Sequence, residues 1–148
     1  MNRIHYKKNR IFIGRIPYKA DLVSYLTKFV NEENIRCGTI NVYGYLEKIV
    51  LTNFEFVSKF TNQVEIISKE TLLEICSLTG VISQFKGRSN IKLSGTFKNY
   101  LGEFIGGTIS IGTIVYSCES VVTEFIGATL SREFDLETGL PLWKNSLL

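Results

Sequence analysis

The chain has 148 residues, the length of one ordinary domain that can bury a hydrophobic core without disulfides or metals. Its net charge of +3 is far from the dense basic stripe of a dedicated nucleic-acid domain, so charge alone gives DNA binding little support. Hydrophobic residues make up 45% and charged residues 21%, a surplus of apolar surface that indicates either a subunit interface or a well-filled monomer core.

The basic residues gather at the N-terminus. Four of them are candidate nucleic-acid contacts: Lys7, Lys8, Arg10 and Arg15. The alternative is that these residues simply belong to a solvated terminus. No apolar run reaches the roughly 18 residues that span a bilayer, and the polar first ten residues lack the apolar region of a signal peptide. Three widely spaced cysteines lie in apolar stretches and are expected to be reduced, buried thiols: Cys37, Cys76 and Cys118. We therefore expect a cytoplasmic protein with no membrane contact.

The first predicted element is a strand over Arg10–Ile16, which is rich in β-branched and aromatic residues and is closed by Pro17. After Pro17 the spacing of the apolar residues changes from every second residue, as in a strand, to every third or fourth residue, as in a helix. Apolar residues recur at helical spacing from Leu22 to Val30, and Asp21 is placed to cap the first turn. This pattern predicts one helix that ends near residues 31–34.

The middle of the chain alternates between apolar and polar residues, which is typical of half-buried strands. Strands are predicted over 35–45, 48–56, 60–69 and 71–83, followed by a polar loop over 84–90. Glu74 lies inside the last of these strands. A carboxylate that faced the sheet interior would have to be paired or protonated, whereas one that faced outward would simply be solvated.

A hairpin follows, in which strands over 91–97 and 104–109 flank a turn at Asn99–Gly102, and the returning strand carries the pair Gly106-Gly107. A further strand over 112–122 contains Glu119, a second lone acid in an apolar run. The tail from Leu130 to Trp143 mixes charges with turn residues, and we expect it to lie over the sheet with Trp143 as its anchor.

These elements predict a single domain over residues 1–148 of the α+β (α/β) class. It would consist of an antiparallel or mixed sheet of about seven or eight strands with one main helix packed on it.

The order of the segments resembles the plant and prokaryote conserved (PPC) domain family. The likeness lies in the ordered set of motifs rather than in any single one: Gly38-Thr-Ile-Asn-Val-Tyr-Gly44, Glu74-Ile-Cys-Ser-Leu-Thr-Gly80, Gly106-Gly107, Gly112-Thr-Ile-Val with Glu119, and Arg132-Glu-Phe-Asp-Leu-Glu-Thr-Gly-Leu140. The resemblance implies a compact homotrimer that is a predicted DNA-binding or transcription-associated protein. The AT-hook of plant members is not expected here, because Gly14-Arg15-Ile16-Pro17 lacks its first arginine and lies in a predicted strand.

The resemblance also points to a position where many prokaryotic members hold three imidazoles suited to zinc. The matching residues here are Lys92, Ser94 and Thr108, none of which is an imidazole, and a lysine ammonium would repel a divalent cation. We therefore expect no metal and no cofactor. The only histidine, His5, is poorly placed to serve as a catalytic base, which argues against an enzyme of the Ser-His or Cys-His type.

The leading expectation is a non-catalytic homotrimer whose partners are copies of itself and possibly DNA or a regulatory protein. A second hypothesis is a small-molecule pocket at the subunit boundary, with these candidate ligand-binding residues: Lys92, Ser94, Thr108, Gly106, Gly107, Glu74 and Glu119. A third is an enzyme-derived scaffold that has lost its metal site.

Overall fold

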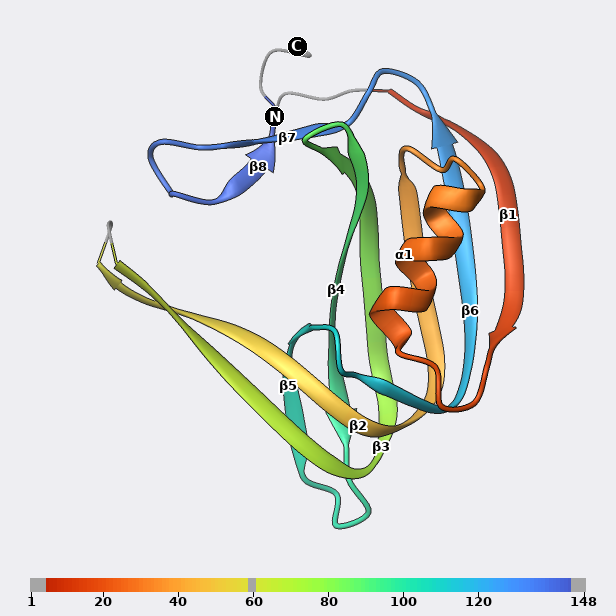
Figure 1. Cartoon of the computed structure of the whole chain (residues 1–148), viewed down its shortest axis with the longest axis vertical. Helices are drawn as coiled ribbons and strands as arrows, with labels where there is room; N and C mark the ends of the chain where they lie inside the picture. Colours follow the sequence, from red (N-terminus) through yellow and green to blue (C-terminus); the bar gives the residue numbers. More distant parts are fainter. Residues whose placement is uncertain (1–4, 59–60, 145–148) are drawn as a thin grey trace.

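Long strands dominate the structure, a computed structural model that describes residues 5–58 and 61–144. The elements in chain order are β1 (Lys7–Ile16), α1 (Leu22–Glu32), β2 (Gly38–Ser58), β3 (Thr61–Phe85), β4 (Arg88–Lys98), β5 (Phe104–Ile109), β6 (Ile114–Ile126), β7 (Ser131–Phe134) and β8 (Pro141–Trp143) (Figure 1). The side chains of residues 53–65 are outside the description.

All the strands belong to one eight-stranded sheet with the order β1-β6-β2-β5-β4-β3-β7-β8. The second strand is its hub, because β2 pairs with β6, with β3 and, at Leu51 and Thr52, with β5. The pairings β2–β3, β3–β4, β4–β5 and β5–β2 therefore form a closed ring, and the distal parts of β2 and β3 extend from it as a two-stranded arm (Figure 1). Among the described residues, only the short β3–β7 pairing is parallel.

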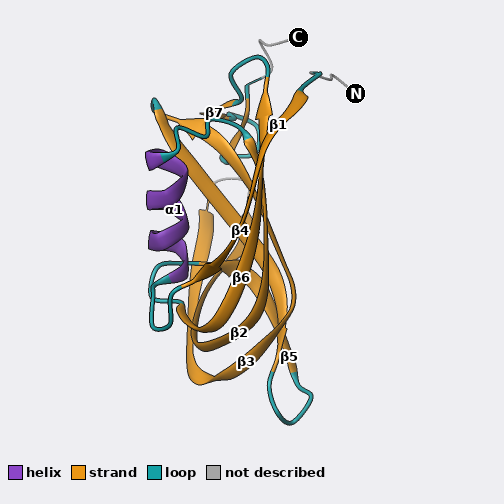
Figure 2. Ribbon diagram, turned by 90° about the vertical axis from the view of Figure 1, so that its right-hand side faces the viewer, coloured by secondary structure: helices purple, strands orange, loops and turns teal. Residues whose placement is uncertain are grey.

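The helix forms where the sequence predicts it. Asp21 is the N-cap, and its carboxylate accepts a hydrogen bond from the Ser24 amide at 2.9 Å. The helix buries one stripe, Leu22, Leu26 and Val30, against the sheet, and Phe29 meets Phe12 of β1 edge to face. Figure 2 shows α1 on one side of the sheet, so the other side carries no helix among the described residues.

The predicted fold class was wrong: the protein is mostly β rather than α+β. The single helix has 11 residues, whereas β2 and β3 alone have 21 and 25. The helix covers only part of one face, and the sheet continues past it on both sides. The predicted number of strands holds, but two pairs of predicted strands are each one continuous bent strand. The first residue of the predicted strand 60–69, Phe60, lies outside the described residues.

Two local predictions were also wrong. The residues predicted as a polar loop mostly belong to β3 and β4, and the chain reverses over Lys86 and Gly87, both with positive φ, as a tight hairpin turn requires. The tail does not lie over the sheet with Trp143 buried. It forms the hairpin β7–β8, which extends the sheet beyond β3, and Trp143 is 51% exposed beside the Arg132 guanidinium.

Candidate functional site

The face of the sheet without a helix, called here the open face, carries all but one of the predicted ligand-binding residues. Directly opposed residues of antiparallel strands point to the same side of a sheet, so the registers define rows of neighbouring side chains. One such row crosses six strands: Ile13, Val121, Asn41, Thr79, Ser94 and Thr108. The residues between them in sequence, such as Val122, Ile40 and Leu93, are buried on the side of the helix.

The polar half of the open face lies on β4 and β5, which pair locally as the predicted hairpin. Ser94 opposes Thr108, and their hydroxyl oxygens are 2.9 Å apart. Lys92 lies two residues before Ser94 on the same face, is exposed, and makes no ion pair with any described residue. Gly106 opposes Thr96 on this face, while Gly107 opposes Gly95 and belongs to the other face. The structure therefore brings Lys92, Ser94 and Thr108 into one patch, bordered by the glycine pair.

The two predicted acids lie on the open face but not in this patch. Glu74 pairs with Lys98 across β3 and β4, with 2.8 Å between carboxylate and ammonium, and the hydrogen bond raises the pKa of Lys98. Lys98 is four residues from Ser94, or about 13 Å along an extended strand. Glu119 is exposed on β6 opposite Tyr43, and β6 is three strand spacings, about 14 Å, from β4. Within one chain the predicted pocket residues thus form three separate places rather than one.

The other half of the open face carries four exposed, large apolar side chains, with Arg15 and Glu119 among them. Ile11 and Ile13 of β1 are 45% and 79% exposed, and Tyr43 and Tyr45 of β2 are 57% and 44% exposed. These four residues, called here the apolar patch, lie on strands separated only by β6, whose Val121 continues the surface between them. Exposed large apolar side chains gathered on one face are typical of a protein contact.

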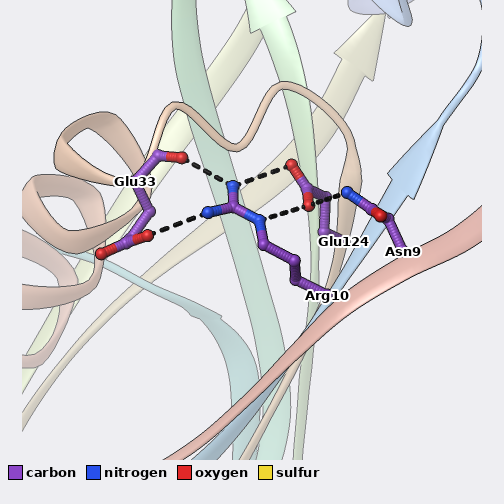
Figure 3. A network of polar contacts seen from close by, with 4 residues as sticks. All are labelled: Asn9, Arg10, Glu33 and Glu124. Atoms are coloured by element: carbon purple, nitrogen blue, oxygen red, sulfur yellow. Dashed lines mark hydrogen bonds and ion pairs between the residues drawn. The ribbon is translucent and has the colours of Figure 1, made fainter.

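The predicted basic residues of β1 divide into two kinds. Lys7, Lys8 and Arg15 are exposed and form no ion pair with any described residue. Arg10, in contrast, is engaged within the chain (Figure 3). Its Nε donates to Glu124 at 2.7 Å, its Nη2 donates to the other carboxylate oxygen at 3.1 Å, and its Nη1 donates to Glu33 at 3.0 Å.

This network was not found by sequence reasoning. Glu124 is only 6% exposed and also accepts a hydrogen bond from Asn9 at 2.6 Å. The hydrogen bond from Arg10 outweighs the effect of burial and lowers the pKa of Glu124. A signal was present, because Glu124 is a lone acid in an apolar run like Glu119. Its partner Arg10, however, lies 114 residues earlier in the chain, and the sequence pattern does not indicate that the two residues meet.

Cys37 and Cys118 are buried, as predicted, and burial raises the pKa of the Cys118 thiol to about 11. The prediction that Cys76 is buried was wrong, because this thiol is exposed. Among residues 5–58 and 61–144, no three His, Cys, Asp or Glu side chains stand close enough together to hold a metal ion. Within the same residues, α1 is too short to cross a bilayer, and no other helix occurs.

Comparison with solved structures gives close matches over nearly the whole chain. A metal-containing protein from Archaeoglobus fulgidus is 26% identical, with a TM-score of 0.88 and coverage of 98% of this chain and 100% of that one. A plant- and prokaryote-conserved (PPC) protein from Pyrococcus horikoshii is 24% identical, with a TM-score of 0.88 and coverage of 98% of each chain. A candidate DNA-binding protein from Bacteroides thetaiotaomicron is 21% identical, with a TM-score of 0.81 and coverage of 95% and 98%.

No curated protein sequence matches the chain significantly. The family comparison, by contrast, is direct: residues 3–126 match the Plants and Prokaryotes Conserved (PCC) domain, from before β1 to the end of β6. This range includes the helix, the β4–β5 hairpin and both halves of the open face. The chain belongs to the plants and prokaryotes conserved domain family.

Proposed function

We propose that the protein is a non-catalytic homotrimer that associates with DNA in the cytoplasm. The observation that carries this proposal is the apolar patch on the open face, which a second subunit would cover. Support for DNA comes from the family and from relatives described as candidate DNA-binding proteins. The exposed cations of β1 supply the chemistry for phosphate contacts.

Assembly is tested by light scattering coupled to size-exclusion chromatography. The expected mass is three times the 16.8 kDa of one chain. Placing a charge in the apolar patch with Ile13→Asp should shift the mass toward that of a single chain, because a buried unpaired carboxylate opposes association. Leu136→Asp is the matched control, since Leu136 is 98% exposed in the β7–β8 turn and lies outside the patch. A wild-type mass of one chain at high concentration would refute the trimer.

DNA binding is tested separately by fluorescence anisotropy with a labelled duplex at several salt concentrations. Affinity should fall with salt, with a log–log slope of about 0.9 for each phosphate that is neutralised. The double variant Lys7→Ala, Lys8→Ala should reduce that slope by roughly two for each bound subunit. Glu137→Ala serves as a control for altered charge elsewhere. No binding at low salt would remove DNA from the proposal and leave the trimer intact.

The proposal that the protein is not an enzyme rests on the positions of its polar side chains. A general base or nucleophile must stand within hydrogen-bond reach of its partner. Glu74 is engaged by Lys98, and Glu119 is three strands from the Lys92 patch. A screen of the purified protein for hydrolysis of activated esters and phosphoesters should therefore give only background rates. A rate that Ser94→Ala or Lys92→Ala abolished would contradict this assignment.

A small-molecule site at a subunit boundary is the second candidate, favoured by the contact between Ser94 and Thr108 beside the unpaired ammonium of Lys92. In an assembly, Glu74 or Glu119 of a neighbouring copy could complete such a site. Calorimetric titration with inorganic phosphate tests it: Lys92→Ala should weaken binding, whereas Arg15→Ala, on the same face but a different strand, should not. Equal affinity in both variants would exclude the site.

A further inference from the structure

A hollow lies on the other side of the sheet, between α1 and the strands β1 and β6. Its origin is a pair of small residues. Phe12, Gly14 and Ile16 of β1 point toward the helix, and Gly14 stands directly opposite Ser120 of β6. A β-carbon built on Gly14 would have no atom within 4 Å, so the missing side chain leaves open space rather than a tight contact.

The walls of this hollow come from both layers and are mainly apolar, with Arg15 and Tyr25 also among the residues that line it. Phe12 and Val122 line it from the strands, and Leu26 and Phe29 line it from α1, with the rings of Phe12 and Phe29 held edge to face at 5.2 Å. Figure 1 shows α1 lying beside these two strands at the edge of the sheet. The cavity volume is about 330 Å³, which falls within the range of small-ligand pockets and would hold about ten water molecules.

One polar side chain inside the hollow lacks a partner. Five polar or charged side chains are buried in the described part of the chain: Ser83, Gln84, Thr113, Ser120 and Glu124. Four of them make side-chain hydrogen bonds, for example Ser83 with Arg132 and Gln84 with the Arg36 carbonyl. Ser120 is the exception: it is 8% exposed, lines the hollow, and its hydroxyl bonds to no described residue.

These observations indicate which kind of molecule the hollow would bind. The Ser120 hydroxyl bonds to no described residue, so a group that entered the hollow could form a hydrogen bond with it. The hollow is open to solvent, and a ligand that covered its apolar walls would release the water in contact with them. An occupant that matched the site would be mainly apolar, with one hydrogen-bonding group directed at Ser120.

We propose that the hollow between α1, Gly14 and Ser120 binds a small aromatic molecule with a single hydrogen-bonding group, of the size of a phenol or an indole. The ring lies among Phe12, Phe29 and Val122, and the polar group meets the Ser120 hydroxyl. The groups that would contact the ligand lie on the helix side of the sheet, although Ile11, Ile13 and Arg15 of β1 also line the hollow.

The test uses the full chain and indole as the probe, with calorimetry or ligand-observed NMR as the readout. The expected dissociation constant is on the order of 0.1 mM for a ligand of this size. Gly14→Leu should weaken binding at least about tenfold, because the new side chain occupies the hollow without a clash. Lys8→Leu places the same side chain at an exposed position of the same strand and should leave the affinity unchanged.

Ser120→Ala separates the hydrogen bond from the shape. It should weaken indole binding about fivefold, the effect of one ordinary hydrogen bond, and should leave benzene binding unchanged. Because Gly14→Leu could impair folding, amide NMR spectra of the wild-type protein give a second readout, with indole shifting the Gly14 and Ser120 signals. No uptake of indole by the wild type, equal uptake by Gly14→Leu, or shifts confined to other residues would each overturn the proposal.

Discussion

The buried carboxylate of Glu124 should contribute strongly to stability, and Glu124→Gln tests this. The substitution keeps the shape of the side chain but removes the charge that accepts two hydrogen bonds from Arg10 and one from Asn9. It also turns an amide group toward those donors, so at least one contact is lost. Hydrogen bonds to charged groups contribute about 1.5–3 kcal/mol, and Arg10 remains 43% exposed, so solvent screens part of the pair. We expect a loss of about 2 kcal/mol at pH 7.

Urea unfolding at fixed protein concentration measures this loss. With a slope of about 2 kcal/mol per molar urea, the midpoint should fall by about 1 M. Glu137→Gln is the control, since Glu137 is exposed and forms no ion pair with any described residue, and its midpoint should not move.

The pH dependence makes this prediction sharper. The native pKa of Glu124 is lowered, so its stabilising contribution is fully present above the unfolded value of about 4.3 and is lost as pH falls through the native pKa. The difference between wild type and Glu124→Gln should therefore be largest near pH 7 and shrink below about pH 4. Equal stability at pH 7, or a difference that did not change with pH, would refute the reasoning.

Three further predictions follow from other parts of the fold. Asp21→Ala should cost about 1–2 kcal/mol in urea unfolding, because its carboxylate caps α1 and also accepts from the Gly112 amide at 2.6 Å; Asp21→Asn should recover part of the loss, and no effect would contradict the cap. With an aromatic disulfide reagent, Cys76 should react within minutes and Cys118 only on unfolding, as thiol counts over time would show; equal rates would contradict the burial of Cys118. The triple variant Lys92→His, Ser94→His, Thr108→His should bind cobalt and show a visible absorption band, because the three positions share one patch. The single variant Ser94→His should not bind cobalt.

Local patterns allowed much of the fold to be predicted. Asp21 and the apolar spacing after it predicted α1, and the turn at Asn99–Gly102 predicted the β4–β5 hairpin. Both depend on residues that are close in sequence. The sequence did not determine whether Glu74 faces the sheet interior or the solvent. Its ion pair with Lys98 shows that it faces outward.

The predictions failed where a tertiary contact outweighed local composition. Gln84 and Ser89 have the polarity of a loop, yet they lie in strands, because the Gln84 amide donates to the Arg36 carbonyl and to the Ser89 hydroxyl. The bends in β2 and β3 come from irregularities in register, which leave little trace in the sequence beyond Gly44 with its φ of +119°.

The candidate site was predictable only in part, for the same reason. The hairpin placed Ser94 opposite Thr108, but the distance of Glu119 from them depends on the order of strands, which hydrophobic periodicity does not determine. One partner of Arg10, Glu124, also comes from the far end of the chain, so a residue that looked free for phosphate is engaged within the fold.

The pairing of β1 with β6 has a consequence for synthesis on the ribosome. The first strand meets residues 118–126, so it has no partner until almost the whole domain has been translated. At about 5–20 residues per second, Ile11 and Ile13 wait on the order of ten seconds with an unpaired backbone. The nascent chain is therefore most exposed to aggregation at its beginning, and slow, late closure of the sheet is the expected folding behaviour.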